Sequence, residues 1–289
     1  MSDLDFSKPG QPATPPPPPP PPVYNAAMAL EFFKSAGKPE GFAPGQRIFA
    51  EDEKAGIFSR ARMYVLVLGE VEMQAQGKPI GVVRVGEVFG EMAVIAGAAR
   101  TATAVAKTQC TVIGLDDKQF QAGLQNKPEF ALMLMSIMNT RLRSTISRLR
   151  ASGSLQHGTA SEAPTFDKKL LQGLVRLMQG QDPVRYDAGK TIMQEGTAGA
   201  LMYIVLEGRV SITIKGALVS RANPGGVFGE MALVDQSPRA ATAVAETDCS
   251  LLAINRPTFL NLVKTSPAFG AALLAGLAGR ARDMADRNK

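Results

Sequence analysis

Two glutamate–arginine pairs with identical spacing are the residues of this sequence best suited to chemistry. Glu91 precedes Arg100 by nine residues, and Glu230 precedes Arg239 by nine residues. An arginine presents a planar, permanently charged fork that matches phosphate oxygens, and a lysine does not. A site for a bare anion would avoid a carboxylate, so each glutamate is expected to accept a hydrogen bond from a hydroxyl. Each pair therefore suits a small ligand with one phosphate and one sugar hydroxyl.

Each pair lies within a stretch whose design occurs twice. The first cassette, residues 89–104, reads F-G-E-M-A-V-I-A-G-A-A-R-T-A-T-A, and the second cassette, residues 228–243, reads F-G-E-M-A-L-V-D-Q-S-P-R-A-A-T-A. A glycine lets the backbone approach a ligand, and the residues after it can form a helical turn whose free N–H groups face an anion. The candidate ligand-binding residues are Phe89, Gly90, Glu91, Met92, Ala93, Arg100, Thr101 and Ala102 in the first cassette, and Phe228, Gly229, Glu230, Met231, Ala232, Arg239, Ala240 and Ala241 in the second.

Both cassettes resemble the phosphate-binding cassette of the cyclic nucleotide-binding domain. This module is shared by catabolite activator proteins, protein kinase A regulatory subunits and cyclic-nucleotide-gated channels. The resemblance implies that Glu91 and Glu230 bind the ribose 2′-OH of cAMP or cGMP, and that Arg100 and Arg239 bind the cyclic phosphate. It also implies that backbone N–H groups at the start of each cassette contact the ligand, and that the fold is an eight-stranded jelly roll capped by helices.

The two cassettes differ beside the arginine. Thr101 follows the first arginine, whereas Ala240 follows the second. The resemblance implies that a hydroxyl at this position helps to admit cGMP, and that alanine is usual in sites that favour cAMP. Ala99 also stands where the second cassette has Pro238. We therefore expect the first arginine to be held less firmly, and the second site to be the more dependable one.

The cassettes belong to a longer internal repeat. Equivalent residues are 139 positions apart from Tyr64 and Tyr203 through to Phe120 and Phe259, but 144 apart near the start of each copy. The first copy therefore carries five extra residues within 52–62, which fits an insertion in a surface hairpin.

Short apolar runs broken by glycine fill each copy. Val210, Ile212 and Ile214, for example, alternate with polar residues, as is typical of a half-buried strand. Short strands with frequent turn signals indicate a closed or double-sheet β domain rather than βαβ units. Together with the resemblance, they predict a mainly β protein with flanking helices, built from two tandem jelly-roll (double-stranded β-helix) barrels.

Helical patterns flank the predicted barrels. Apolar residues recur at intervals of three and four residues over 120–150, with a division near Pro128. Further helices are predicted over 24–37, over 167–179 and within 257–286.

The helix predicted at 130–150 carries an apolar seam. This seam is suited to pairing with a second subunit, as in catabolite activator proteins, or to packing on the chain's own barrel. The sequence leaves both arrangements open, so a homodimer through this helix is one hypothesis. Arginines on its other faces are more typical of a solvated surface than of a nucleic-acid patch. The seam consists of Met135, Met138, Leu142, Thr145 and Leu149.

The predicted organisation has four parts. Residues 1–41 are a Pro-rich disordered tail and a short helix, 42–150 a first cyclic nucleotide-binding domain with its C-terminal helix, 151–166 a linker, and 167–289 a second such domain with its own C-terminal helix. Eight consecutive prolines at 15–22 indicate an extended polyproline II segment. Such a segment suits either a spacer or a ligand for an aromatic groove of a partner.

Composition narrows the function classes. The 289 residues, of which 45% are apolar, suffice for two domains, and the net charge of +6 comes from basic residues interleaved with acidic ones, as on a solvated surface. Cys110 and Cys249 occupy equivalent positions in apolar runs, so we expect small core residues rather than a disulfide or metal ligands. His157 is the single histidine and cannot build a His-rich metal site.

Several motifs are absent from the sequence. No run is long enough to span a bilayer and the first residues lack a signal-peptide pattern, so a cytoplasmic location is expected. No catalytic or kinase signature can be assembled, and no helix-turn-helix follows the second domain, so we expect neither an enzyme nor a DNA-binding protein. The docking helix and inhibitory Arg-Arg segment of protein kinase A regulatory subunits are also missing, which argues against kinase inhibition.

The sequence therefore predicts a receptor for cAMP or cGMP that changes conformation on binding and regulates a partner protein. An alternative is an interaction or scaffold protein that keeps the fold without depending on nucleotide. A third hypothesis keeps the pocket but assigns it to another nucleotide, such as a cyclic dinucleotide.

Overall fold

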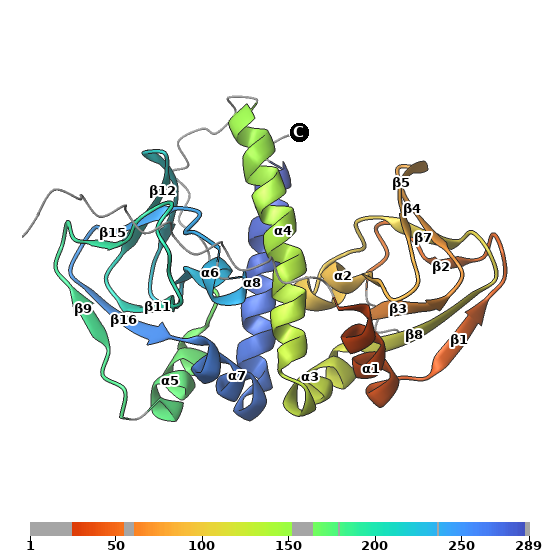
Figure 1. Ribbon diagram of the computed structural model, residues 1–289, viewed down its shortest axis with the longest axis horizontal. Helices are drawn as coiled ribbons and strands as arrows, with labels where there is room; N and C mark the ends of the chain where they lie inside the picture. Colours follow the sequence, from red (N-terminus) through yellow and green to blue (C-terminus); the bar gives the residue numbers. More distant parts are fainter. Residues whose placement is uncertain (1–24, 55–60, 152–163, 179, 236, 287–289) are drawn as a thin grey trace, which may run out of the picture.

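Two β barrels stand side by side in the computed structural model, with two long helices between them (Figure 1). These helices, α4 (Glu129–Ala151) and α8 (Pro267–Asp286), run parallel to each other and pack together. The polyproline tract, His157 and most of the predicted linker lie outside the described residues. The structure describes residues 25–54, 61–151, 164–178, 180–235 and 237–286.

The first barrel consists of two antiparallel four-stranded sheets, with strand orders β1-β8-β3-β6 and β2-β7-β4-β5. A Pro-Gly turn, with Gly45 at φ +80°, separates β1 from β2. Its strands are β1 (Pro39–Phe42), β2 (Arg47–Phe49), β3 (Arg62–Leu68), β4 (Val71–Ala75), β5 (Lys78–Val83), β6 (Val88–Phe89), β7 (Thr103–Ala106) and β8 (Cys110–Asp116), and its other helices are α1 (Ala26–Ala36), α2 (Glu91–Ala96) and α3 (Asp117–Asn126).

The second barrel repeats this topology, with strand orders β14-β11-β16-β9 and β10-β15-β12-β13. The repeat extends to the short helix of each cassette, which is α2 in the first barrel and α6 in the second. Its elements are α5 (Lys168–Leu177), β9 (Val184–Tyr186), β10 (Thr191–Met193), β11 (Met202–Glu207), β12 (Val210–Ile214), β13 (Ala217–Ala222), β14 (Val227–Phe228), α6 (Glu230–Asp235), β15 (Thr242–Ala245), β16 (Cys249–Ile254) and α7 (Arg256–Thr265).

The predicted fold class is confirmed: the chain is mainly β, with two tandem jelly-roll barrels and flanking helices. Proline divides the helices that follow each barrel, because it lacks the N–H that a continuous helix needs. Pro128 separates α3 from α4, and Pro267 begins α8 directly after α7. The first strand begins at Pro39, three residues before the predicted start of the first domain. Cys110 and Cys249 are free and buried, as predicted.

One apolar cluster of helices joins the two domains. In α1 and α4, the rings of Phe32 and Phe130 stack with centroids 3.7 Å apart, and the cluster continues through Met138 to Leu273 and Leu277 of α8. The sequence had left open whether the seam of α4 packs on a second subunit or on the chain's own barrel. In the structure α4 packs against α8 of the same chain, Met135 and Met138 are buried in this cluster, and Leu142 packs on the second barrel. The side chains of Thr145 and Leu149 lie outside the description. A homodimer through this helix stays a prediction.

Asn139 is the exception within this apolar interface. The side chain is 1% exposed, and neither its amide oxygen nor its amide nitrogen has a hydrogen-bond partner in the described part of the chain. Its counterpart in α8, 139 positions later, is the buried Ala278. The observed packing therefore carries an uncompensated polar group at its centre.

We expect Asn139→Leu to raise the free energy of unfolding by about 1 to 3 kcal/mol, because the substitution removes that unsatisfied amide at similar volume. Denaturant titration of the variant and of the parent chain measures the difference. Asn139→Asp is the control and should lower stability, because it places a charge at the same buried position. A less stable leucine variant would contradict the interpretation of this site.

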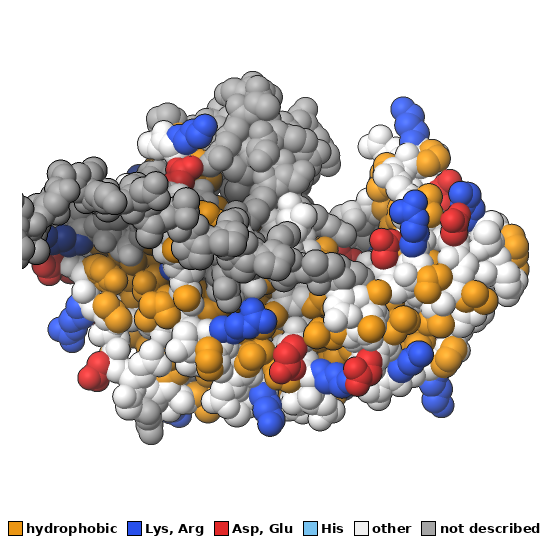
Figure 2. Space-filling view, in the orientation of Figure 1, with side chains coloured by type: hydrophobic (Ala, Val, Ile, Leu, Met, Phe, Trp, Pro, Cys, Tyr) orange, Lys and Arg blue, Asp and Glu red, His pale blue; other side chains and the backbone are white. Residues whose placement is uncertain are grey.

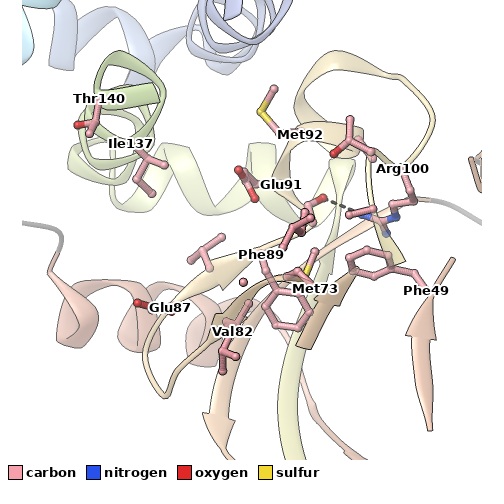
Figure 3. Close-up of a pocket in the computed structure, with 18 of the residues that line it drawn as sticks. Phe49, Met73, Val82, Glu87, Phe89, Glu91, Met92, Arg100, Ile137 and Thr140 are labelled. Atoms are coloured by element: carbon pink, nitrogen blue, oxygen red, sulfur yellow. Dashed lines mark hydrogen bonds between the residues drawn. The ribbon is translucent and has the colours of Figure 1, made fainter. Parts of the chain in front are cut away.

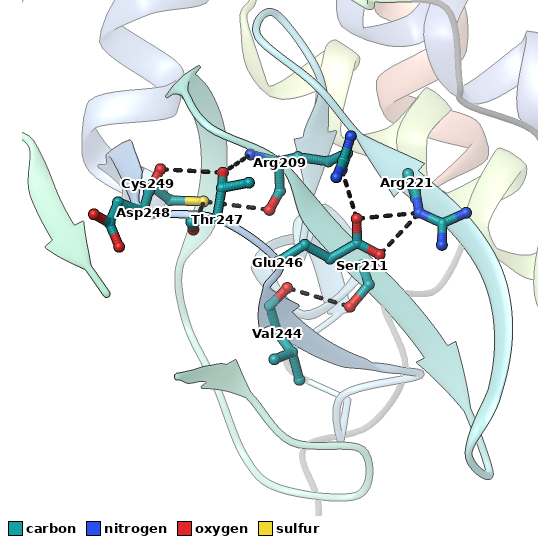
Figure 4. A network of polar contacts seen from close by, with 8 residues as sticks. All are labelled: Arg209, Ser211, Arg221, Val244, Glu246, Thr247, Asp248 and Cys249. Carbon is teal, nitrogen blue, oxygen red and sulfur yellow. Dashed lines mark hydrogen bonds and ion pairs between the residues drawn. The ribbon is translucent and has the colours of Figure 1, made fainter. Parts of the chain in front are cut away.

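A surface ion-pair network joins the strands of the second barrel (Figure 4). Glu246 follows β15 and accepts hydrogen bonds from Arg209 Nε at 2.6 Å and from Arg221 Nε at 2.8 Å. In the first barrel the equivalent positions hold Glu70 and Lys107, whose ion pair is 3.2 Å long. The two copies have exchanged the signs of the charges and kept the contact.

Burial acts to raise the pKa of Glu246, but hydrogen bonds and positive charge from Arg221 and Arg209 outweigh it and leave the pKa below its usual value. The network therefore stabilises the fold above the carboxyl's unfolded pKa, and this contribution is lost as the pH falls through the folded pKa. We expect Glu246→Gln to cost about 0.2 to 1 kcal/mol at neutral pH and progressively less in acid, as measured by denaturation across pH. A cost that persists unchanged in acid would exclude the electrostatic origin.

The described part of the face in Figure 2 shows Lys and Arg side chains interspersed with Asp and Glu, as the sequence predicts. No single helix among the described residues has the length and apolar content to cross a membrane, although α7 and α8 pass that test as a pair bent by 114°.

Candidate ligand-binding sites

The second residue of each cassette is a glycine whose position leaves no room for a Cβ. Gly90 has φ +70° and Gly229 has φ +78°, and the short helices α2 and α6 start at the next residue. A Cβ on Gly90 would lie 2.8 Å from Arg100 Nη1, and one on Gly229 would lie 2.8 Å from Arg239 Nη1. The glycine therefore sets both the turn into the helix and the close packing of the arginine.

Arg100 is fixed from three sides. Its side chain is buried, and Nη1 donates to the Gly90 carbonyl at 2.7 Å (Figure 3). Nη2 donates to the Arg62 carbonyl at 2.6 Å. The guanidinium also lies over the Phe49 ring, 4.0 Å from its centroid. The expectation that Ala99 leaves this arginine loosely held is therefore wrong. These three contacts fix the side chain although no proline precedes it.

Burial lowers the pKa of Arg100 below its ordinary value, and attraction by Tyr64, Glu53 and Glu91 partly offsets this effect. Burial likewise lowers the pKa of Arg239. An arginine remains charged at such shifts, so each cassette holds a poorly hydrated positive charge. An anionic ligand would stabilise that charge and so replace part of the hydration that the guanidinium loses on burial.

The first cassette opens into a cavity of about 670 Å³. Glu91 is 3% exposed and lies between Arg100 and the residues of α4 (Figure 3). The described surface is hollowed beside the β4–β5 hairpin (Figure 2), and residues of β5 and α4 line the cavity. All the residues predicted for the first cassette line this cavity: Phe89, Gly90, Glu91, Met92, Ala93, Arg100, Thr101 and Ala102.

Sequence reasoning missed the walls that lie outside the cassette. Ile80 and Val82 of β5 form one wall and are exposed, at 61% and 37%. Ile137 of α4 forms another, and the predicted helix and strand patterns gave no sign that the two meet. The other missed lining residues are Phe49, Met73, Gly81, Val83, Glu87, Val88, Ser136 and Thr140.

The second cassette faces a much smaller cavity, of about 80 Å³. Two side chains from the central helices enter its lining, Leu142 of α4 and Arg280 of α8. Arg280 Nη1 donates to Glu230 Oε1 at 3.1 Å. The more open site is thus the first. Seven of the residues predicted for the second cassette line this cavity: Phe228, Gly229, Glu230, Met231, Arg239, Ala240 and Ala241. The eighth, Ala232, lies in α6, and its side chain is outside the description.

Comparison with known proteins identifies the two barrels. The model of the cyclic nucleotide-binding domain matches residues 39–127 and 183–266, which together are more than half of the chain. The chain belongs to the cyclic nucleotide-binding domain family. Both matches contain a cassette, so the paired glutamates and arginines lie within the two cyclic nucleotide-binding domains.

Among curated proteins, isozyme 2 of a cGMP-dependent protein kinase of Drosophila melanogaster is 26% identical over 214 residues, covering 70% of this chain. The chain spans 17% of that kinase's length. Among solved structures, the regulatory domain of Toxoplasma gondii PKA with cAMP is 21% identical, with a TM-score of 0.30 and coverage of 86% of this chain and 87% of that one. Thermus thermophilus catabolite activator protein is 20% identical, with a TM-score of 0.39 and coverage of 56% and 71%.

The glycine that opens the first cassette can be tested by substitution. Gly97 serves as the reference, because it also has a positive φ, of +58°, but has open space around a Cβ. We expect Gly97→Ala to lower the free energy of unfolding by about 1 to 2 kcal/mol through backbone strain alone. Gly90→Ala should cost more, because its Cβ also meets Arg100 and the Phe49 ring. Denaturant titration of both variants gives the comparison, and equal costs would show that the arginine packing contributes nothing.

Proposed function

We propose that this protein is a cyclic nucleotide receptor whose first domain supplies the open binding site. The observation that supports this proposal is the cavity of about 670 Å³ that brings buried Arg100 and Glu91 together. Its volume falls within the range of small-molecule sites, roughly 300 to 1,000 Å³. The second cavity, at about 80 Å³, falls below that range.

The arrangement of the lining matches the chemistry of a cyclic nucleotide from one end to the other. The cyclic phosphate would meet Arg100 and the first N–H groups of the cassette, and the ribose hydroxyl would meet Glu91. A purine would then extend between the apolar Ile80 of β5 and Ile137 of α4. Thr140, one turn from Ser136 on α4, places a hydroxyl at the same end of the cavity.

Thr101 favours cGMP as the preferred ligand of this site. The residue lines the cavity directly after Arg100 and is exposed, so its hydroxyl can reach a bound ligand. In the family that the cassettes resemble, a hydroxyl at this position helps to admit cGMP. The second cassette has Ala240 there, and its side chain offers no hydrogen bond.

The proposed role is regulation by binding rather than catalysis. The Glu91–Arg100 pair is accounted for by ligand contacts, and α4 supplies the route to a response. This helix lines the cavity and also packs against α8, so ligand contact with α4 changes the packing between the domains. A partner protein that contacts the central helices would detect the change.

We expect Arg100→Ala to weaken cyclic nucleotide binding by at least about 100-fold, because it removes charge-assisted hydrogen bonds worth roughly 1.5 to 3 kcal/mol each. Arg100→Lys should bind with intermediate affinity, since it keeps the charge but loses the planar fork. Calorimetric titration with cAMP and with cGMP measures both affinities.

Arg239→Ala is the matched control for that experiment. It removes an equally buried arginine with the same contact to its own cassette glycine, and it should leave the first equivalent of nucleotide bound. If the parent chain gives no heat with either nucleotide, the alternative is favoured, namely a scaffold that keeps the fold without using nucleotide. The side chains that already occupy the second cavity are consistent with that alternative.

A further inference from the structure

Side chains from both central helices close the second cavity. Leu142 of α4 packs there with Val219 and Met231, in a small apolar cluster that also includes Ile214 and Ala241. Leu142 follows the first barrel in sequence, so a residue of the first domain covers the site of the second. A purine cannot enter without displacing it.

Among the described residues, no side chain of α8 lines the first cavity. Val219 is 8% exposed under Leu142, whereas its counterpart in the first barrel, Ile80, is 61% exposed. The sequence also differs at the matching position of the two helices, where α8 has Ala281 in place of the leucine of α4.

Arg280 adds a second, polar closure. Its guanidinium donates to Glu230 at 3.1 Å, and the two side chains are 16% and 4% exposed. Glu230 is the residue expected to accept the ribose hydroxyl in this site. A nucleotide must therefore compete with a largely buried ion pair, whose separation leaves both charges poorly solvated.

α4 stands between the two cavities. Ile137 and Thr140 line the first, and Leu142 lines the second. Residues two positions apart on a helix point to nearly opposite sides, so one rigid element faces both sites. α8 is placed in the same way, because it carries Arg280 at the second cavity and packs against α2 of the first cassette. A shift of either helix therefore acts on both sites.

The geometry points to a second site that is held closed by Leu142 and Arg280 and opens when a ligand in the first site moves the central helices. This inference rests on the proposed function of the first site. Binding is then ordered: one equivalent of cyclic nucleotide enters the first cavity, and the second equivalent follows with at least tenfold weaker affinity. The buried, unsatisfied amide of Asn139 lies in the same interface and lowers the stability of the packing that keeps the second site closed.

Calorimetric titration of four chains with cAMP and cGMP tests the inference. The parent chain should take up one tight and one weaker equivalent. Leu142→Ala with Arg280→Ala should take up two equivalents of comparable affinity. The Arg100→Ala chain should bind no nucleotide, because its empty first site leaves the second site closed. The chain that combines Arg100→Ala with Leu142→Ala and Arg280→Ala should bind one equivalent, because its second site is open.

Two controls separate closure from general loosening. Leu134→Ala removes the same atoms from a buried position of α4 that lines neither cavity, and it should leave the binding pattern of the parent chain unchanged. Thermal unfolding confirms that each variant is folded before titration.

The outcomes are distinguishable. Absence of binding to the parent chain contradicts the proposed function itself. Two independent, equal sites in the parent chain, or a full equivalent bound to the Arg100→Ala chain, contradict the closure while leaving the receptor function intact. Failure of the Leu142→Ala, Arg280→Ala chain to gain a second strong equivalent, when it is folded, contradicts the assignment of these two side chains.

Discussion

A buried arginine is the constraint on which each cassette depends. Arg100 and Arg239 are both 6% exposed, and each donates a hydrogen bond to the carbonyl of the glycine that opens its own cassette. A guanidinium removed from water stays in place only where carbonyl oxygens or ring faces replace the lost hydration. The positive φ of that glycine makes the contact possible and also starts the short helix that follows. Turn, helix and charge are therefore positioned by one interaction.

Duplication has produced two copies of this arrangement around a shared pair of helices, and single substitutions have made the copies unequal. α4 presents Ser136, Ile137 and Thr140 to the first cavity, whereas the matching positions of α8 are alanine and two glycines. Leu142 and Arg280 then occupy the space beside the second cassette. Two sites with nearly the same ligand-binding residues thus differ in access, because the residues that decide access lie on the central helices and not in the cassettes.

The sequence predicted what depends on local pattern. The doubled cassette, the barrels and the division of the helices near Pro128 follow from spacing, turn residues and periodicity, which act over a few positions. It did not predict the cavity walls from β5 and α4, because these segments meet the cassette only through tertiary packing. It also misjudged Arg100, since the carbonyl of Arg62 and the ring of Phe49 come from strands distant in sequence.

The interface between the central helices is suited to repacking rather than to maximum stability. A ligand shifts an equilibrium only by its differential affinity for two states, so those states must lie within a few kcal/mol of each other. A seam of well-packed apolar residues along α4 and α8 would widen that gap. Asn139 interrupts such a seam, because it buries an amide without a partner in the described chain. It lowers the stability of the observed packing and so narrows the gap that the binding energy of the proposed ligand would have to overcome.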